Sequence, residues 1–309
     1  MSVKTQGILA AILGASAFAT ASIFSKLLLN YFTPVTLAAL SQVISIVTLL
    51  LIFGFVPELR KLRHLNRRQV LALLAIGALA AVIAPLSLLR GLQSTTATNA
   101  ILIGKLDPLL TDLIAVLWLK ETLQRRQVTG IGIMLIGMYV VITGGTLQLL
   151  QFNPGDLYIV VFSLAVALAT NIFKKFLSDL SPDLAVLARN LVGATFLVSL
   201  PFLRGDGHVL APWEPHIWLT LIAFAVVTII VAQYFWYRAL ELVSAATVSS
   251  LSLISPLVGI ILAVIILGES LTPAHFVGGS ITLSGLFLLI SHHTPHLPVR
   301  LRMLAWHHH

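Results

Sequence analysis

The sequence contains no cysteine and few charged residues, and it carries no common catalytic motif. Without cysteine the chain can form no disulfide, thiolate metal site or cysteine nucleophile. Only 10% of the 309 residues are charged, whereas a soluble protein carries about 25%. The polar surface is therefore too small to face water on all sides, which indicates a lipid environment. A nucleophile elbow, a Walker loop and an HExxH motif are all missing, so we expect no enzyme, no cofactor and no metal site.

Apolar residues dominate instead, at 58% of the chain with a mean hydropathy of +1.00. A helix that crosses a bilayer needs about 20 apolar residues. Ten stretches come near that length: Gly7–Leu29, Pro34–Phe55, Val70–Leu89, Thr96–Leu119, Val128–Gly144, Asp156–Leu177, Pro182–Leu203, His216–Leu240, Ala245–Leu267 and Ala274–Ser291. The runs are continuous and do not alternate, which favours helices over a barrel. The sequence therefore predicts an all-α integral membrane protein with ten transmembrane helices.

The lysines and arginines gather in alternate connections between these stretches. Residues 57–69 hold five of them and residues 120–127 hold three, whereas the opposite connections carry Lys26, Arg90 and Arg204. Cytoplasmic loops are the ones enriched in Lys and Arg. We therefore expect a multi-pass protein of the cell inner (plasma) membrane with both termini cytoplasmic. The net charge of +8 then reflects topology, and no nucleic-acid partner is expected.

The chain repeats itself at an offset of 148 residues. The shift superposes Lys26 on Lys174, Pro108 on Pro256, Glu121 on Glu269, Gly130 on Gly278 and Gly137 on Gly285. Self-similarity of this kind is evidence of a duplicated architecture. It predicts a first five-helix repeat over residues 1–148 and a second over 149–293. Residues 294–309 are then a cytoplasmic tail, whose last three histidines resemble a purification tag.

Five spans per repeat is an odd number, so the two repeats must enter the membrane from opposite sides. Inverted repeats are characteristic of secondary transporters, because exchanging the conformations of the two halves converts an inward-open state into an outward-open one. The duplication therefore predicts an exporter or facilitator of a small molecule that works by alternating access.

Residues 108–137 and 256–285 share a pattern of Pro, an apolar run, Leu-x-Glu-x-Leu, and two glycines one heptad apart. This pattern resembles the hairpin of the EamA family in the drug/metabolite transporter superfamily, and the resemblance covers both repeats. It implies export or facilitated passage of small metabolites, often amino acids, through a cavity between the halves.

The fourth stretch holds an acid–base cluster deep in the predicted bilayer, formed by Lys105, Asp107 and Asp112. On one continuous helix Thr98, Lys105 and Asp112 share a stripe, and Asp107 lies nearly opposite. A charge at mid-bilayer costs at least about 2.5–3.5 kcal/mol. Lys105 is therefore predicted to offer a cation to a substrate carboxylate or phosphate, and an aspartate to accept an amino group or a proton. The alternative is that these charges neutralise one another or a charge on a neighbouring helix, and that Asp112, near the cytoplasmic end, simply meets water. The ninth stretch has Ala246, Leu253, Ser255 and Ile260 at the equivalent positions, so the charges belong to the first repeat alone.

Other polar residues are weaker candidates. Gln233 and Tyr234 could contact a flat substrate or belong to an interfacial aromatic belt. Arg189 could bind an anion or extend to the cytoplasmic surface, and Asn171 is weaker still. Glu121 and Glu269 recur in both halves, so we expect them to anchor helix ends. The repeated glycines are expected to pack the fifth span on the fourth and the tenth on the ninth.

Together these features predict a transporter of a small metabolite, with an amino acid as the best candidate. Membrane lipid is the other expected partner, protons are a candidate coupling ion, and the chain is expected to be a monomer or a weak homo-oligomer. Two alternatives stay open. One is a transporter of another anionic or nucleotide-linked metabolite, and the other is an intramembrane lipid-modifying enzyme built around Asp107 and Asp112.

Overall fold

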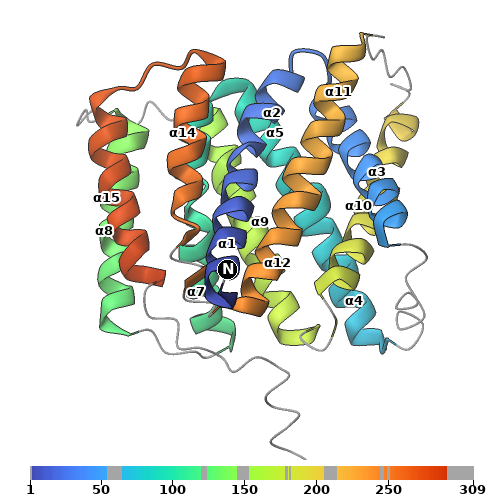
Figure 1. Ribbon diagram of the computed structural model, residues 1–309, viewed down its shortest axis with the longest axis horizontal. Coiled ribbons are helices and arrows are strands. Elements are labelled where there is room, and N and C mark those ends of the chain that lie inside the picture. The colour runs from blue at the N-terminus through green and yellow to red at the C-terminus, as the bar shows by residue number, and fades with distance from the viewer. Residues whose placement is uncertain are drawn as a thin grey trace, which may run out of the picture.

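The computed structural model describes residues 2–53, 65–119, 124–144, 153–177, 180, 182–204, 214–243, 247–248 and 251–290. Most of these residues lie in helices (Figure 1). The helices are α1 Val3–Ala19, α2 Ala21–Leu28, α3 Pro34–Phe53, α4 Arg67–Ile76, η2 Gly77–Ile83, α5 Ala84–Ser94, α6 Ala97–Ile103, α7 Leu106–Leu119, α8 Arg125–Thr143, α9 Pro154–Phe176, α10 Pro182–Arg204, α11 Pro215–Ala223, η3 Phe224–Val231, α12 Ala232–Leu242, α14 Ile254–Leu267 and α15 Pro273–Ile290.

Four of the described helical segments are long and apolar enough to cross a membrane. They are Val3–Leu28, Arg67–Ser94, Arg125–Thr143 and Pro154–Phe176. Shorter apolar helices accompany them, among them Ile254–Leu267. The expectation of a helical membrane protein is confirmed, and the number of ten spans stays a prediction.

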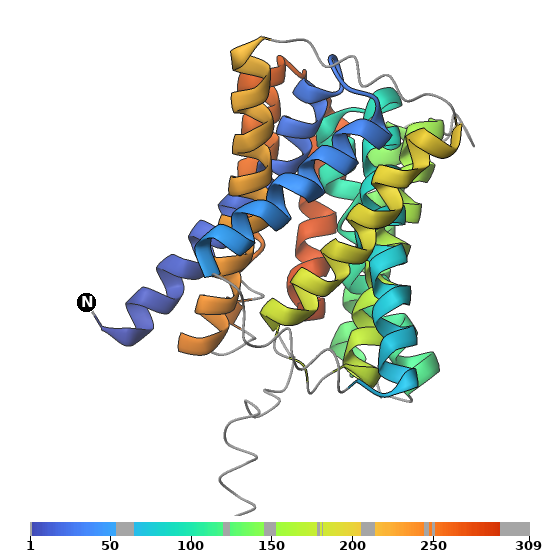
Figure 2. The same cartoon turned by 90° about the vertical axis from the view of Figure 1, so that its right-hand side faces the viewer.

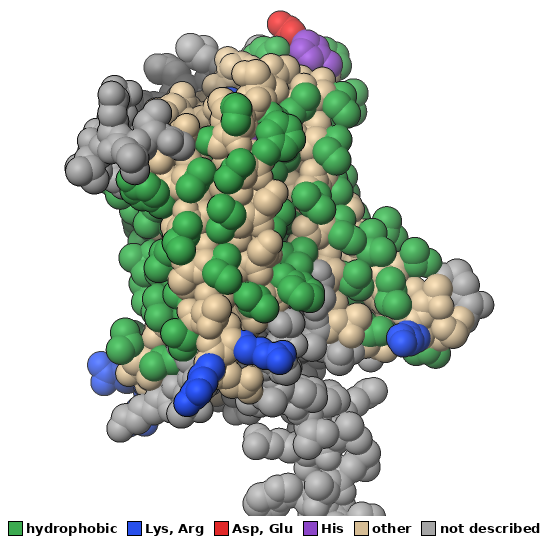
Figure 3. Space-filling model, turned by 90° about the vertical axis from the view of Figure 1, so that its left-hand side faces the viewer, with side chains coloured by type: hydrophobic (Ala, Val, Ile, Leu, Met, Phe, Trp, Pro, Cys, Tyr) green, Lys and Arg blue, Asp and Glu red, His purple; other side chains and the backbone are tan. Residues whose placement is uncertain are grey.

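The outer surface of the bundle is apolar. Leu51, Leu117 and Ile265 are 79%, 83% and 73% exposed, which water would penalise and lipid does not. Hydrophobic side chains cover the middle of the molecule and the visible lysines and arginines lie at its lower end (Figure 3). This is the arrangement of a lipid-facing belt above a basic rim.

The fourth predicted span is two helices, α6 and α7, which are separated by a turn at Gly104 and Lys105. Pro108 causes the break, because it has no N–H to donate to the Gly104 carbonyl four residues earlier and its ring crowds that carbonyl. The Gly104 carbonyl accepts instead from the Asp107 N–H at 3.2 Å. The prediction of one helix over Thr96–Leu119 was wrong, and so was the stripe that depended on it.

The second repeat is broken at the equivalent position. Ser252 and Leu253 form a turn before α14, and both lie 148 residues after the turn at Gly104 and Lys105. Pro256 follows Ser252 by four residues, and the Ser255 N–H donates to the Ser252 carbonyl at 3.0 Å. One proline in each repeat therefore sets one helix break in each repeat.

Two π-helical segments are also related by the offset. η2 lies between α4 and α5, and η3 lies between α11 and α12. Shifting η2 by 148 residues gives 225–231, within η3. Such segments are rare and are often found at functional sites. At η2 the Gln42 amide donates to the Ala81 carbonyl at 3.2 Å. The repeats thus share irregular backbone in the third and eighth spans as well.

The two repeats meet along α8 and α15, which lie side by side (Figure 1). A Cβ built on Gly285 would lie 2.7 Å from the Gly130 carbonyl oxygen, and one on Gly278 would lie 2.7 Å from the Gly137 carbonyl oxygen. The expectation that these glycines pack α8 on the fourth span and α15 on the ninth was wrong. Glycines at matching heptad spacing on both helices allow direct backbone contact between the repeats instead.

Candidate functional site

Lys105 and Asp107 lie at the break in the fourth span. Lys105 occupies the turn, is half-buried, and interacts electrostatically with Asp107 in the first turn of α7. A carboxylate is favourable at a helix N-terminus, where the backbone dipoles leave partial positive charge. No residue that the structure describes forms a hydrogen bond with the Lys105 ammonium group. The break therefore presents a cation and an anion close together, with donors on the cation still unused.

Helix α9 holds this span in place along its length. The Thr95 hydroxyl donates to Asp156, the Ser163 hydroxyl donates to the Gly104 carbonyl at 3.4 Å, and the Asn171 amide donates to the Thr111 carbonyl at 3.0 Å. The three α9 residues are spaced by seven and eight, so they share one broad helix face. The equivalent residues of the first repeat are Ile8, Ala15 and Ile23.

Asn171, one of the weaker candidates from the sequence, has an unusual environment on α9. It is buried, and its Oδ1 has no hydrogen-bond partner among the described residues. A buried acceptor without a partner costs about 1–3 kcal/mol. The first repeat has Ile23 at the equivalent position, so this buried amide belongs to the second repeat alone.

Two other candidates on the fourth span point elsewhere. The Thr98 hydroxyl donates to Glu269 Oε2 at 2.9 Å. Asp112 receives the Gln127 amide of α8 at 3.5 Å. The structure therefore does not gather Thr98, Lys105 and Asp112 into one site.

The candidates on the second repeat lie on α10 and α12, which pack mainly on helices other than α6 and α7. Arg189 is half-buried on α10, which packs on α3 and η2. Tyr234 is 54% exposed on α12, and its ring lies edge-on to Phe235 with the centroids 5.4 Å apart. The backbone of Gln233 belongs to α12, and its side chain lies outside the described residues.

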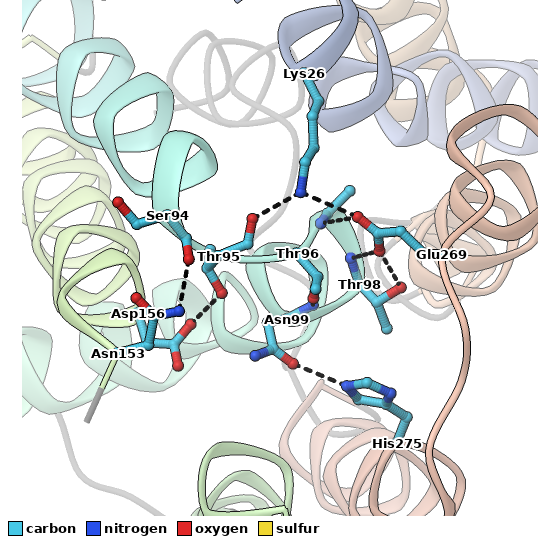
Figure 4. Close-up of polar contacts among 11 residues, drawn as sticks. Lys26, Ser94, Thr95, Thr96, Thr98, Asn99, Asn153, Asp156, Glu269 and His275 are labelled. Atoms are coloured by element: carbon cyan, nitrogen blue, oxygen red, sulfur yellow. Dashed lines mark hydrogen bonds and ion pairs between the residues drawn. The ribbon is translucent and has the colours of Figure 1, made fainter. Parts of the chain in front are cut away.

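Glu269 forms a second polar centre at one end of the bundle (Figure 4). Its Oε1 accepts from the Ala97 N–H at 2.6 Å, and its Oε2 accepts from the Thr98 N–H at 3.0 Å. The Lys26 ammonium lies 3.2 Å from Oε1 and donates to the Thr95 carbonyl at 2.8 Å. The expectation that Glu269 anchors a helix end is confirmed, since it caps α6; Glu121 lies outside the described residues.

The contacts of Glu269 decide its charge. Burial by itself would raise the pKa of this carboxyl, but the hydrogen bonds from Thr98 and Ala97 and the charge of Lys26 outweigh it. The pKa of Glu269 is therefore held below its ordinary value, and the group is an anion at neutral pH. Its stabilising contribution is present above the ordinary pKa of a glutamate and is lost as the pH falls through the lowered value.

The polar centre continues to α15. His275 Nδ1 accepts from the Thr272 N–H at 3.0 Å, and His275 Nε2 lies 3.0 Å from Asn99 Oδ1. Because Nδ1 is an acceptor, the proton is assigned to Nε2, which donates to Asn99. Within the described part of the chain, no group of His, Asp and Glu side chains is arranged to hold a metal ion.

Comparison with known proteins agrees with this architecture. The model of the EamA-like transporter family matches twice, over residues 5–143 and 153–291. An uncharacterized transporter of Synechocystis is 27% identical over 78% of this chain and 71% of its own. A probable amino-acid metabolite efflux pump of Salmonella typhimurium is 30% identical over 55% of this chain and 59% of its own. One crystal structure shares the fold, with a TM-score of 0.59 and 17% identity over 93% of this chain and 96% of the other. The chain belongs to the EamA-like transporter family and is a membrane transporter.

Proposed function

We propose that this transporter carries an amino acid and binds it at the break between α6 and α7. Lys105 would receive the carboxylate and Asp107 the ammonium group. The observation that carries the proposal is the pair of opposite charges at a helix break, with no hydrogen bond to the Lys105 ammonium from the described residues. In transporters with repeats, discontinuous helices commonly form the substrate site near the bilayer midplane.

Two further observations support the proposal. The related Salmonella protein is named a probable amino-acid metabolite efflux pump, and the helix break recurs at Ser252 and Leu253 in the second repeat. We infer alternating access between inverted repeats in the inner membrane, with the end of the bundle that carries Arg67, Arg125 and Lys175 in the cytoplasm.

The alternative cargoes fit less well. A nucleotide-linked metabolite carries several negative charges. Among the described residues that the sequence singles out for the site, Arg189 is the one further cation, and its helix packs mainly on α3 and η2. A lipid-modifying enzyme built on Asp107 and Asp112 would need the two carboxylates to act together. Asp112 instead receives the Gln127 amide of α8, which disfavours that alternative.

A ligand panel tests the proposed charge recognition. We expect the cognate amino acid to raise the melting temperature of the purified protein, because a ligand at 100 times its Kd stabilises by about 2.7 kcal/mol. The methyl ester and the decarboxylated amine of the same amino acid are matched controls, and neither should shift the melting temperature. An amine that stabilises as well as its parent amino acid would show that the carboxylate is not recognised.

Asp107→Asn tests the ammonium contact. We expect the variant to bind the amino acid about 10- to 100-fold more weakly, because a hydrogen bond to a charged group is worth about 1.5–3 kcal/mol. The 2-hydroxy acid analogue lacks the ammonium group and should bind wild type and variant equally, as measured by calorimetry. Asp112→Asn serves as the control and should leave the amino-acid affinity unchanged. Equal weakening of both ligands would argue for general damage to the site.

A further inference from the structure

One carboxylate joins both repeats at one end of the bundle, which we call the Glu269 face. The first repeat contributes Lys26 at the end of α2 and the Ala97 and Thr98 groups that begin α6. The second repeat contributes Glu269, from the connection between α14 and α15. In Figure 4 Lys26 and the start of α6 both point at Glu269. Two helices of one repeat thus meet a single side chain of the other.

The Glu269 carboxylate is a charged group that is largely shielded from water. The Glu269 side chain is 10% exposed, so nearly all of its water has been replaced. Four donors replace it: two backbone N–H groups, the Thr98 hydroxyl and the Lys26 ammonium. A carboxylate buried this deeply is stable only while such donors are present. Separating the repeats here therefore requires water to reach the carboxylate and all four donors.

The backbone around Glu269 ties it to α14. Gly268 adopts φ of +66° and ends α14, a left-handed conformation that glycine adopts at little cost. The Glu269 N–H then donates back to the Ala263 carbonyl at 3.3 Å. Because Glu269 lies two residues after the last residue of α14, a movement of α14 away from α6 carries the carboxylate with it.

The same contact reaches the proposed substrate site through a short path. Helix α6 runs only from Ala97 to Ile103, and Lys105 follows it in the turn. Glu269 holds the first residues of this helix, so a shift at its start is passed to Lys105 within two turns. At the opposite end of the molecule α1 and α12 lean away from α4 (Figure 2). Helix α1 belongs to the first repeat and α12 to the second, and they pack on each other, so the divergence at that end separates this pair from α4 and not one repeat from the other. The polar contact at the Glu269 face does join the two repeats.

We propose that Glu269, Lys26 and the first turn of α6 form a latch between the repeats, which holds the Glu269 face shut and must separate for solute to pass there. The structure has the latch closed. The proposal depends on transport between the repeats and not on which solute is carried.

The absence of cysteine allows a direct distance measurement. Tyr31 beyond α2 and Phe276 in the first turn of α15 are exposed and belong to different repeats. Nitroxides attached to Tyr31→Cys and Phe276→Cys in the full chain, in nanodiscs without solute, report the separation across the Glu269 face by pulsed electron resonance. We expect Glu269→Gln to increase the long-distance population about tenfold. The substitution replaces the charged carboxylate by a neutral amide, and hydrogen bonds to a neutral group are weaker than those to a charged one. Lys26→Met removes one of the four donors and should give a smaller increase.

Two controls separate a latch from a general loosening. Glu214→Gln alters an exposed pair with His216 (3.4 Å) and should leave the distances unchanged. A second label pair, Val128→Cys with Phe287→Cys, spans α8 and α15 and should keep its wild-type distance in Glu269→Gln. An unchanged Tyr31–Phe276 distance, or equal broadening of both pairs, overturns the proposal. If Glu269→Gln does not fold, Lys26→Met decides the question by the same criteria. No solute is present, so failure of the latch and failure of the amino-acid proposal are separate results.

Discussion

Lys105→Ala is expected to lower amino-acid uptake into proteoliposomes by about 100-fold, since the charged hydrogen bonds it removes are worth about 1.5–3 kcal/mol each. The described residues form no hydrogen bond with the Lys105 ammonium, so its loss should leave the melting temperature near that of wild type. The expected combination is a folded protein that no longer transports. Radiolabelled uptake and a thermal unfolding curve on the same preparation measure both quantities.

Two matched variants define what that loss means. Lys105→Arg keeps the positive charge but replaces the compact ammonium by a planar guanidinium group, so the variant should retain part of the uptake. Lys175 lies in the last turn of α9, with its ammonium nitrogen 4.4 Å from the centre of the Trp118 ring. Lys175→Ala removes this cation, and uptake should stay at the wild-type level. Wild-type uptake by Lys105→Ala would remove Lys105 from the substrate site.

Gly137→Val is expected to destabilise the protein by about 3 kcal/mol or more, because overpacking a close contact costs about 1–3 kcal/mol even where side chains can yield. Here two of the three nearest atoms are backbone atoms of α15. A Cβ on Gly137 would lie 2.6 Å from the Gly278 carbonyl oxygen on α15. The two helices must move apart, which weakens the contact between the repeats. The change is measured as the shift in thermal or denaturant unfolding of the purified protein.

Gly132→Val on the same helix is the control. A Cβ at Gly132 has no atom within 4 Å, so the substitution should leave the stability close to wild type. The helix-propensity change is the same at both positions, and the difference between the variants isolates the packing of α8 on α15. Equal destabilisation by both variants would mean that this close contact is not what stabilises the repeats.

The sequence alone indicated the membrane environment, the duplication and the family, because each depends on composition or on residues compared along the chain. The apolar runs exclude a water-facing fold, and the 148-residue offset superposes proline on proline and glutamate on glutamate. The sequence also shows Lys105 and Asp107 as charges of the first repeat alone, since the second repeat has Leu253 and Ser255 in their places. Their role in substrate binding stays a prediction.

The break in the fourth span could have been anticipated from Pro108, because a proline interrupts the hydrogen bond to the residue four positions earlier. Prolines are nevertheless tolerated within many transmembrane helices, so sequence did not decide between a kink and a turn. The turn matters, because it removes Thr98 from the helix face of Lys105 and leaves the ammonium at a helix break.

The partners of the glycines and of Glu269 were decided by tertiary structure alone. Sequence identifies Gly137 and Gly285 as residues for close packing, but any two small-residue faces are compatible, and α8 packs on α15 rather than on its neighbours in the chain. Glu269 accepts a hydrogen bond from Ala97 at the start of α6, although the two residues are 172 positions apart in the sequence. Sequence therefore determined which residues can form close or charged contacts. The tertiary structure alone decided which of these surfaces meet, because the pairing depends on how all the helices pack and on how the buried polar groups find hydrogen-bond partners.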